Sequence, residues 1–524
     1  MDQKADTSTL ELGVKSAKVA SYIGLTHIIS VIVAGVALIV LARLLQPDQY
    51  GIYTLAYSVW ALFSASNLAG IGQYLNKYVP VWIARKKRNE LSNDLGTGFV
   101  SLVLISLVAV AIGFALSGTI SQYAFHSLSY VPLIDLALAA VLFTQLNLLA
   151  YNTLIGFKDG IGSAVAYDIG ALATASASIG LVVLGYGVYG AIAGLMVGGV
   201  IGLAAGLLII TRHISIKLPI AGFGKRASRI LAFSLPLAIA SIINSAVSNF
   251  AVLFLGVFST TEILGSYGVA LRIATLVSTA AAFIGAVLVP TFSSALEGKN
   301  PSGQLDKLYN YSVYFGAAIG VPIAVYLIVL ARSLVTSVFP AYVSSLLYTP
   351  LITVAVLIGV INTYAAALVV SVGDVKRVVK YTVIVGTVQF ALLFLLVPLI
   401  NAYGIIVGVY LIGNILANYL YMRHMKRRLK IETRLGGVYK IIAAGLMLGV
   451  ALFAVSLAPI NDTFKLAAGI AVMILLYPAL LGLIRAIGRE EMRLLSAISK
   501  SSGMFGHVVG IVVAYVSVFS GDVN

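Results

Sequence analysis

Long apolar stretches separated by short polar segments run through the chain from end to end. A helix needs about 20 apolar residues to cross a bilayer. Fourteen stretches come close to that length. They lie near 21–45, 52–80, 97–120, 132–156, 163–185, 190–211, 230–257, 265–290, 309–331, 350–371, 380–400, 403–425, 440–459 and 465–487. The pattern predicts an all-α polytopic membrane protein with about 14 transmembrane helices.

Composition agrees with this pattern. Of the 524 residues, 60% are apolar and 10% are charged, whereas soluble domains have roughly 45–50% and 25%. Cysteine is absent, which excludes disulfides, thiolate metal sites and thiol nucleophiles. We expect no metal and no cofactor. Segment 1–20 carries charges of both signs without a small-residue cleavage site, so we expect the N-terminus to stay attached.

The charge balance is informative about topology. There are 34 Lys and Arg against 18 Asp and Glu, giving +16. In a soluble chain this excess would suggest nucleic acid, but in a membrane chain it reports loop orientation. With both termini inside, 30 of the 34 basic residues fall on the inner side, and only Arg43, Arg332 and Lys465 lie outside. We expect a multi-pass protein of the cytoplasmic membrane, in contact with membrane lipids and not with nucleic acid.

An internal repeat divides the sequence. Tyr189 begins the run YGAIAG, and 214 residues later Tyr403 begins YGIIVG. Gly51 and Gly265 have the same offset. Each repeat contains six predicted helices. Because six is an even number, both repeats begin on the same side of the membrane and have the same orientation in it. The predicted organisation is an N-terminal segment, an N-lobe, a basic linker, a C-lobe, a helix pair and a tail, at 1–20, 21–211, 212–229, 230–425, 426–487 and 488–524.

The tail contains an apolar stretch at 507–519 that is too short to cross as a helix. It lies at the interface or packs on the bundle. Two parallel repeats enclosing a cavity suit transport by alternating access. The alternative is a stable helical bundle that was merely duplicated.

Segment 41–53, which reads LARLLQPDQYGIY, resembles the opening signature of polysaccharide-biosynthesis flippases. Similar family features are FSLP at 233–236, GSYGVALR at 265–272 and GFKD at 156–159. Over residues 10–487 the chain resembles the multidrug, oligosaccharidyl-lipid and polysaccharide (MOP) exporter superfamily. One position departs from its pattern: Ala251 stands where an acidic residue would precede Gly256.

The resemblance implies a flippase that moves polyprenyl-(pyro)phosphate-linked oligosaccharide to the outer leaflet by alternating access. It also implies a V-shaped pair of lobes around a cationic cavity, with the last two helices forming a groove for the lipid tail. The implied partners are the lipid-linked oligosaccharide and other cell-envelope glycan assembly proteins. Because of Ala251, the resemblance assigns no coupling carboxylate to the seventh helix.

Arg272 is the central candidate for substrate binding, because an arginine inside a span needs water or a partner. Thr275 and Thr279 lie on the same helix face. The guanidinium could bind a diphosphate in bidentate fashion. The alternative is a structural pair with a carboxylate or with carbonyl oxygens. Asp168, in the fifth span, is the candidate for coupling to H⁺ or Na⁺, and neutralisation of a basic neighbour is the other interpretation.

Polar pairs at helical spacing complete the candidate substrate site. Asn244 and Ser248 lie four residues apart in the seventh span, and Gln145 and Asn152 lie seven apart in the fourth. Such pairs bind sugars or connect helices by hydrogen bonds. Arg43, at the end of the first span, either reaches the outer interface or lies at the mouth of the cavity.

Two other functions remain open. An ion-coupled drug or metabolite antiporter of the same superfamily is the first. A membrane-embedded glycosyltransferase or polymerase is the second, although the short outer loops offer no large catalytic domain. No phosphate-binding Walker pattern is present, so we expect a transporter without catalytic residues, driven by a gradient, by the membrane potential or by product consumption.

Overall fold

A computed structural model describes residues 2–65, 69–217, 222–296, 301–434, 437–487, 492, 510 and 514–518. Side chains are described from residue 32 onward within these ranges, except at 69, 236, 237, 240, 280, 282–291, 293–295 and 301. The apolar stretch 507–519 and most of the tail 488–524 lie outside the described residues.

The described part of the chain is built from helices and contains no strand, which confirms the predicted all-α fold class. The helices are α1 (Asp2–Ala65), α2 (Ala69–Ala84), α3 (Arg88–Ala124), α4 (Val131–Gly156), α5 (Gly160–Leu181), α6 (Gly187–His213), α7 (Phe223–Phe258), α8 (Thr261–Ala295), α9 (Pro301–Val329), α10 (Ala331–Val338), α11 (Thr349–Ser371), α12 (Val375–Ile400), α13 (Ala402–Ile405), α14 (Gly413–His424), α15 (Val438–Leu457) and α16 (Asp462–Leu483). Two short 3₁₀ segments, Leu128–Tyr130 and Pro340–Leu347, and three π-helical segments, Val182–Tyr186, Ile406–Ile412 and Met425–Leu429, connect or extend them.

Eleven helical stretches in the described ranges are long and apolar enough to cross a membrane. One of them, Gly160–His213, contains two of the predicted spans. The non-helical turn at Gly185 separates these two spans. The molecule is therefore a multi-pass membrane protein, and the count of 14 helices stays a prediction.

Backbone turns mark several of the predicted span boundaries. Gln46 has φ 60° inside α1, where the following proline disfavours helical geometry. Gly185 and Gly187 have positive φ between α5 and α6, and Asn401 has φ 49° before α13. The second predicted span, 52–80, differs from the structure: α1 continues to Ala65 and the separate helix α2 begins at Ala69.

The chain forms two compact units, Met1–Gly265 and Ser266–Asn524. Helix α7 belongs to the first unit, where it packs against α1, α2 and α3. The boundary between the two compact units thus lies after α7. The boundary between the two sequence repeats lies earlier, in the linker 212–229. The division into an N-lobe, 21–211, and a C-lobe, 230–425, rests on the sequence repeat and stays a prediction.

In the first unit, α5 and α6 pack closely against each other and against α4. Small residues permit this contact: a Cβ on Gly190 would meet the backbone carbonyl carbon of Leu181 at 2.8 Å, and one on Gly199 would meet the backbone nitrogen of Thr144 on α4 at 2.8 Å. Across the pair, the Ser178 hydroxyl donates to the Ala191 carbonyl at 2.9 Å. Small residues at close helix contacts are typical of membrane bundles.

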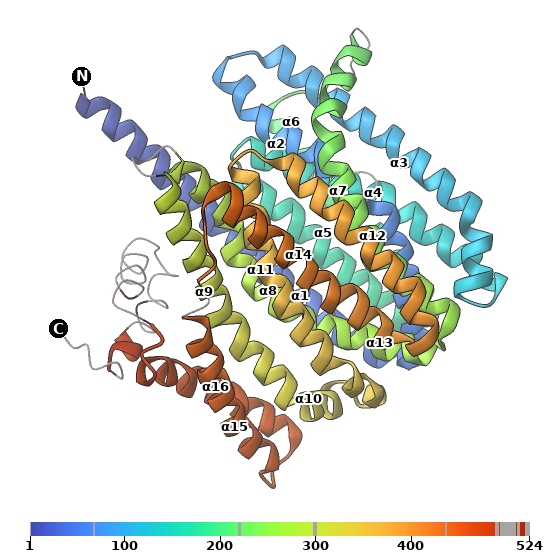
Figure 1. Cartoon of the computed structure of the whole chain (residues 1–524). Coiled ribbons are helices and arrows are strands. Elements are labelled where there is room, and N and C mark those ends of the chain that lie inside the picture. Colours follow the sequence, from blue (N-terminus) through green and yellow to red (C-terminus); the bar gives the residue numbers. More distant parts are fainter. Residues whose placement is uncertain are drawn as a thin grey trace. The chain divides into compact units, whose positions relative to one another are not determined.

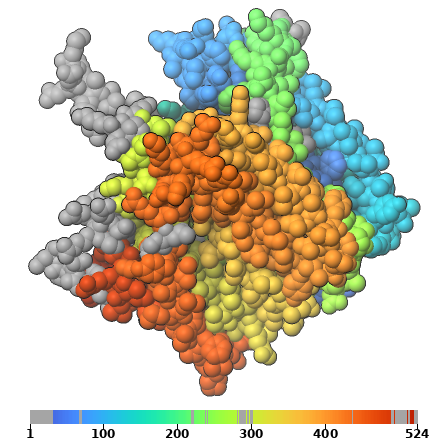
Figure 2. Space-filling view, viewed as in Figure 1, coloured from blue at the N-terminus to red at the C-terminus, as the bar shows by residue number. Residues whose placement is uncertain are grey.

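In the second unit, α15 and α16 lie side by side and contact α9, while α16 also contacts α10 (Figure 1). Helix α14 is hydrogen-bonded to α11: Asn414 and Asn418 donate to the carbonyls of Ala355 and Ile358 at 3.0 and 3.1 Å. Helix α12 packs against α14, and their residues, coloured orange, form a continuous part of the surface in Figure 2.

Candidate functional site

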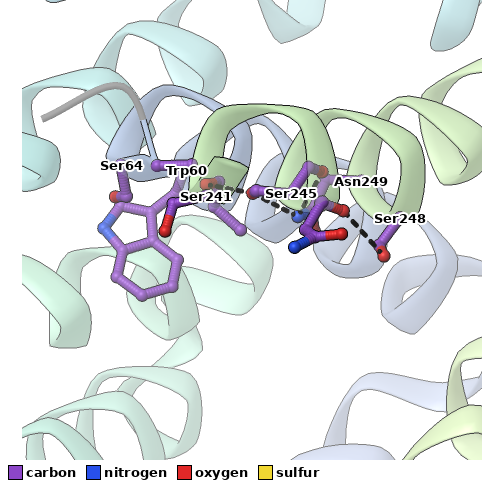
Figure 3. A pocket seen from close by; sticks show the side chains of 9 residues that line it. Trp60, Ser64, Ser241, Ser245, Ser248 and Asn249 are labelled. Atoms are coloured by element: carbon purple, nitrogen blue, oxygen red, sulfur yellow. Dashed lines mark hydrogen bonds between the residues drawn. The ribbon is translucent and has the colours of Figure 1, made fainter. Parts of the chain in front are cut away.

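An open groove of about 550 Å³ lies between α1 and α7 in the first unit (Figure 3). Its lining combines one large aromatic ring with hydroxyl and amide side chains and alanines. The lining residues are Trp60, Ala61, Ser64, Ala65, Ser241, Asn244, Ser245, Ser248 and Asn249. No charged side chain is among them, so the groove is neutral, and its surface is mainly apolar with a few hydroxyl and amide groups.

Side-chain hydrogen bonds hold the wall that α7 contributes. The Ser245 hydroxyl donates across to the Ala61 carbonyl of α1 at 3.2 Å. The Asn249 amide donates to the carbonyl and the hydroxyl of Ser245, both at 3.0 Å (Figure 3). These hydrogen bonds fix Asn249 and Ser245 in the groove wall. The indole N–H of Trp60 donates to the Thr144 hydroxyl of α4 at 3.2 Å, which fixes the ring on the opposite wall.

Both members of the predicted pair on the seventh span line the groove. Asn244 is exposed, and the Ser248 hydroxyl donates to its carbonyl at 3.1 Å. On α1, Ser64 is 7% exposed, and its hydroxyl has no hydrogen-bond partner among the described residues. Buried hydroxyls normally have a partner, so the Ser64 hydroxyl is an unsatisfied polar group beside the groove.

The chemistry of the groove matches a polyhydroxylated ligand. Amide and hydroxyl groups both donate and accept hydrogen bonds, as do the hydroxyls of a sugar, and the Trp60 ring supplies a flat apolar surface. No cationic side chain lines this groove, so the expected cationic character does not arise here.

Arg272 lies on α8 in the second unit and is partly buried. It interacts electrostatically with Tyr410, in the π-helical segment before α14. The hydroxyls of Thr275 and Thr279 donate to carbonyls of their own helix, those of Arg272 and Thr275, at 2.7 and 2.9 Å. The three residues therefore form a polar stretch whose hydroxyl hydrogens are already engaged.

Asp168 lies on α5 beside an aromatic pair. The rings of Tyr151 on α4 and Tyr167 on α5 are 5.1 Å apart, and the carboxylate interacts electrostatically with both tyrosines. Asp168 is partly buried. A partly buried carboxylate with phenol neighbours can bind a proton or a small cation.

The remaining candidates lie apart from the groove lining. Gln145 is buried in α4, and its Oε1 has no partner among the described residues. Asn152 donates to the Leu148 carbonyl at 2.9 Å and lies against Gly72 of α2, so its contacts are those of helix packing. Arg43 is exposed on α1, and its carbonyl accepts a hydrogen bond from Gln46 at 3.2 Å.

A buried carboxylate network near one end of the unit was not predicted from the sequence. Asp94 on α3 is 1% exposed, and Arg229 on α7 donates to its two oxygens at 2.7 and 2.8 Å. Tyr74 and Trp82 on α2 donate to the same carboxylate at 3.1 and 2.9 Å. The network connects α2, α3 and α7. Asp94 lies between the predicted spans 52–80 and 97–120, and Arg229 lies in the predicted basic linker 212–229, so the sequence pattern gave no signal for the network.

A family model described as "Polysaccharide biosynthesis protein" matches residues 40–342, more than half of the chain. No curated protein sequence matches the chain.

Solved structures with a similar fold are membrane transporters. The lipid II flippase MurJ in an inward closed conformation has a TM-score of 0.71 at 14% identity, covering 87% of this chain and 97% of its own. An inward-facing multidrug resistance MATE family transporter of the MOP superfamily has a TM-score of 0.63 at 16% identity, covering 76% of this chain and 95% of its own. A MOP superfamily transporter from Pyrococcus furiosus, described as having a binding pocket of reverse polarity, has 0.57 at 15% identity, with coverages of 79% and 96%.

Proposed function

The chain belongs to the family of polysaccharide biosynthesis proteins, and from this we propose that it is a flippase for polyprenyl-(pyro)phosphate-linked oligosaccharide. The protein carries its substrate from the inner to the outer leaflet of the cytoplasmic membrane by alternating access, without covalent chemistry. Both termini lie in the cytoplasm. Its partners are the lipid-linked oligosaccharide, membrane lipids and other glycan assembly proteins.

The observation that carries this proposal is the neutral groove between α1 and α7. Its hydroxyl and amide side chains and the Trp60 ring suit the sugar portion of such a substrate. The pyrophosphate requires a cation, and Arg272 is the residue that supplies it, because a guanidinium binds a diphosphate in bidentate fashion and keeps its charge. Sugar and phosphate are thus recognised by different groups.

The experiment is transport in liposomes that contain lipid-linked oligosaccharide, measured as its arrival in the opposite leaflet. Asn244→Ala combined with Ser248→Ala should slow flipping roughly tenfold, since each lost hydrogen bond costs about 0.5–1.5 kcal/mol. Thr387→Ala is the matched control, because this exposed hydroxyl on α12 donates to its own helix, at 2.9 Å. Undiminished flipping by the double variant would remove the groove from the substrate pathway.

Arg272→Ala tests the phosphate contact in the same liposomes. We expect flipping to fall by roughly two orders of magnitude, because a charge-assisted bidentate contact of about 3 kcal/mol is lost. Arg332→Ala, which removes an exposed arginine, is the control. If the two variants flip equally well, Arg272 does not bind the pyrophosphate.

An ion-coupled drug antiporter is the second candidate function. The likeness of the fold to a multidrug MATE transporter and the carboxylate of Asp168 among tyrosines favour it. Such a protein would exchange a cationic drug for H⁺ or Na⁺ and would leave the lipid-linked oligosaccharide in place.

A further inference from the structure

The two sequence repeats share an Asp–His pair at the ends of corresponding helices. In the first unit, Asp159 precedes α5 and accepts from His213, the last residue of α6, at 2.9 Å. In the second, Asp374 precedes α12 and faces His424, the last residue of α14, at 3.5 Å. The preceding turns match as well: the backbone N–H groups of Asp159 and Asp374 donate to the carbonyls five residues earlier, each at 3.1 Å.

The two pairs differ in how their aspartates are engaged. In the first unit Asp159 also caps α5 through the Gly162 N–H, at 2.7 Å, so both carboxylate oxygens are used. In the second unit Asp374 makes no such cap, and its other contact is a long ion pair with Arg377 at 3.7 Å. The second pair is therefore the looser one.

A pocket of about 370 Å³ opens at this looser pair. It is lined by Val369, Val372, Gly373, Asp374, His424, Arg428 and Leu429. The side chain of His424 is only 4% exposed, whereas Arg428 is exposed and forms no ion pair with the described residues. One buried imidazole and one accessible guanidinium thus share a cavity with an apolar side.

The surroundings of this pocket are strongly basic and lie at helix ends. Lys376 and Lys380 follow on α12, and the run 426–428 follows α14. The candidate spans Thr349–Ser371, Val375–Ile400 and Ala402–Leu429 all have an end here, which places the pocket at a membrane interface. Basic pockets between transmembrane helices at an interface are suited to anionic lipid headgroups.

We propose that this pocket binds the phosphate group of a membrane phospholipid, with Arg428 as its main contact. The guanidinium pairs with the phosphate oxygens, and the buried His424, whose Nε2 faces Asp374 at 3.5 Å, forms the wall behind it. Val369, Val372 and Leu429 contact the first carbons of the lipid. The site is independent of the groove between α1 and α7, so it stands or falls separately from the proposed transport.

The experiment uses the full chain in detergent and titrates it with short-chain dioctanoyl phosphatidylglycerol, measuring the dissociation constant. Dioctanoylglycerol, which lacks the phosphate, is the matched probe. We expect phosphatidylglycerol to bind more tightly than dioctanoylglycerol. Arg428→Gln should weaken phosphatidylglycerol binding roughly tenfold. Arg427→Gln, which removes the neighbouring charge outside the pocket, should change it less than about twofold.

Three results would overturn the proposal. Equal weakening by Arg427→Gln and Arg428→Gln would mean diffuse attraction to the basic surface. Equal binding of dioctanoylglycerol would mean that no phosphate is recognised. Equal affinity for inorganic phosphate would mean that the pocket takes the ion from solution and not from a lipid. Since Arg428 is exposed, its substitution leaves the folded protein available for each titration.

Discussion

The carboxylate of Asp94 takes hydrogen bonds from side chains of two other helices, α2 and α7. Asp94→Asn removes the charge that pairs with the half-exposed Arg229 guanidinium, and because solvent screens that guanidinium we expect a loss of about 1 kcal/mol. We expect a lower unfolding temperature in detergent, followed by the fluorescence of Trp82 and Trp60. Glu262→Gln, at an exposed carboxylate, is the control. An unchanged unfolding temperature for Asp94→Asn would show that the network does not stabilise the unit.

Single residues of the site were predictable where helical spacing selects one face. Asn244 and Ser248 were found by their spacing, and both line the groove. Ser64 and Trp60 could not be found in this way, because periodicity describes one helix and does not name the helix that packs opposite. Asp94 was missed because a charged residue near a basic loop has the same sequence pattern whether it is solvated or buried.

At the scale of helices, α1 and the first turn of α8 touch through their backbones. A Cβ on Gly51 would meet the Thr261 carbonyl, and one on Gly265 would meet the Pro47 carbonyl. The two glycines are also equivalent in the repeat, with the same offset of 214 residues as Tyr189 and Tyr403. Close approach of backbones, and not a turn, is therefore the reason for glycine at these two positions.

Gly51→Ala should lower both the yield of folded protein and its unfolding temperature, because backbone atoms cannot move aside as a side chain can. Gly118→Ala is the control: no atom lies within 4 Å of its added Cβ, and alanine favours a helix. The control should unfold at the same or a higher temperature. Comparable unfolding temperatures for the two variants would contradict the close contact.

The order and type of the helices followed from the length and spacing of the apolar stretches. Their partners did not. Helix α7 packs with the first unit, although the repeat groups it with the second half, because contacts such as Arg229 to Asp94 depend on three-dimensional proximity. The resemblance of 41–53 to a polysaccharide-biosynthesis family is confirmed, since the family model covers that segment.

For the whole molecule, Asp168 is the proposed site at which transport is coupled to H⁺ or Na⁺. Asp168→Asn removes the charge and keeps the size of the side chain, so transport should no longer respond to an imposed H⁺ or Na⁺ gradient. The measurement compares rates with and without each gradient in the same liposomes. Asp48→Asn, at an exposed carboxylate of α1, is the control. A gradient response that survives in Asp168→Asn would exclude this residue as the coupling site.

Substrate choice by the wild-type protein tests the proposed function most directly. Liposomes containing the protein are given either a lipid-linked oligosaccharide or a cationic drug, and transfer of each across the bilayer is measured. We predict that the lipid-linked oligosaccharide reaches the opposite leaflet at a rate well above that of protein-free liposomes, while the drug does not cross. Drug uptake without movement of the lipid-linked oligosaccharide would contradict a flippase and would identify the protein as an antiporter.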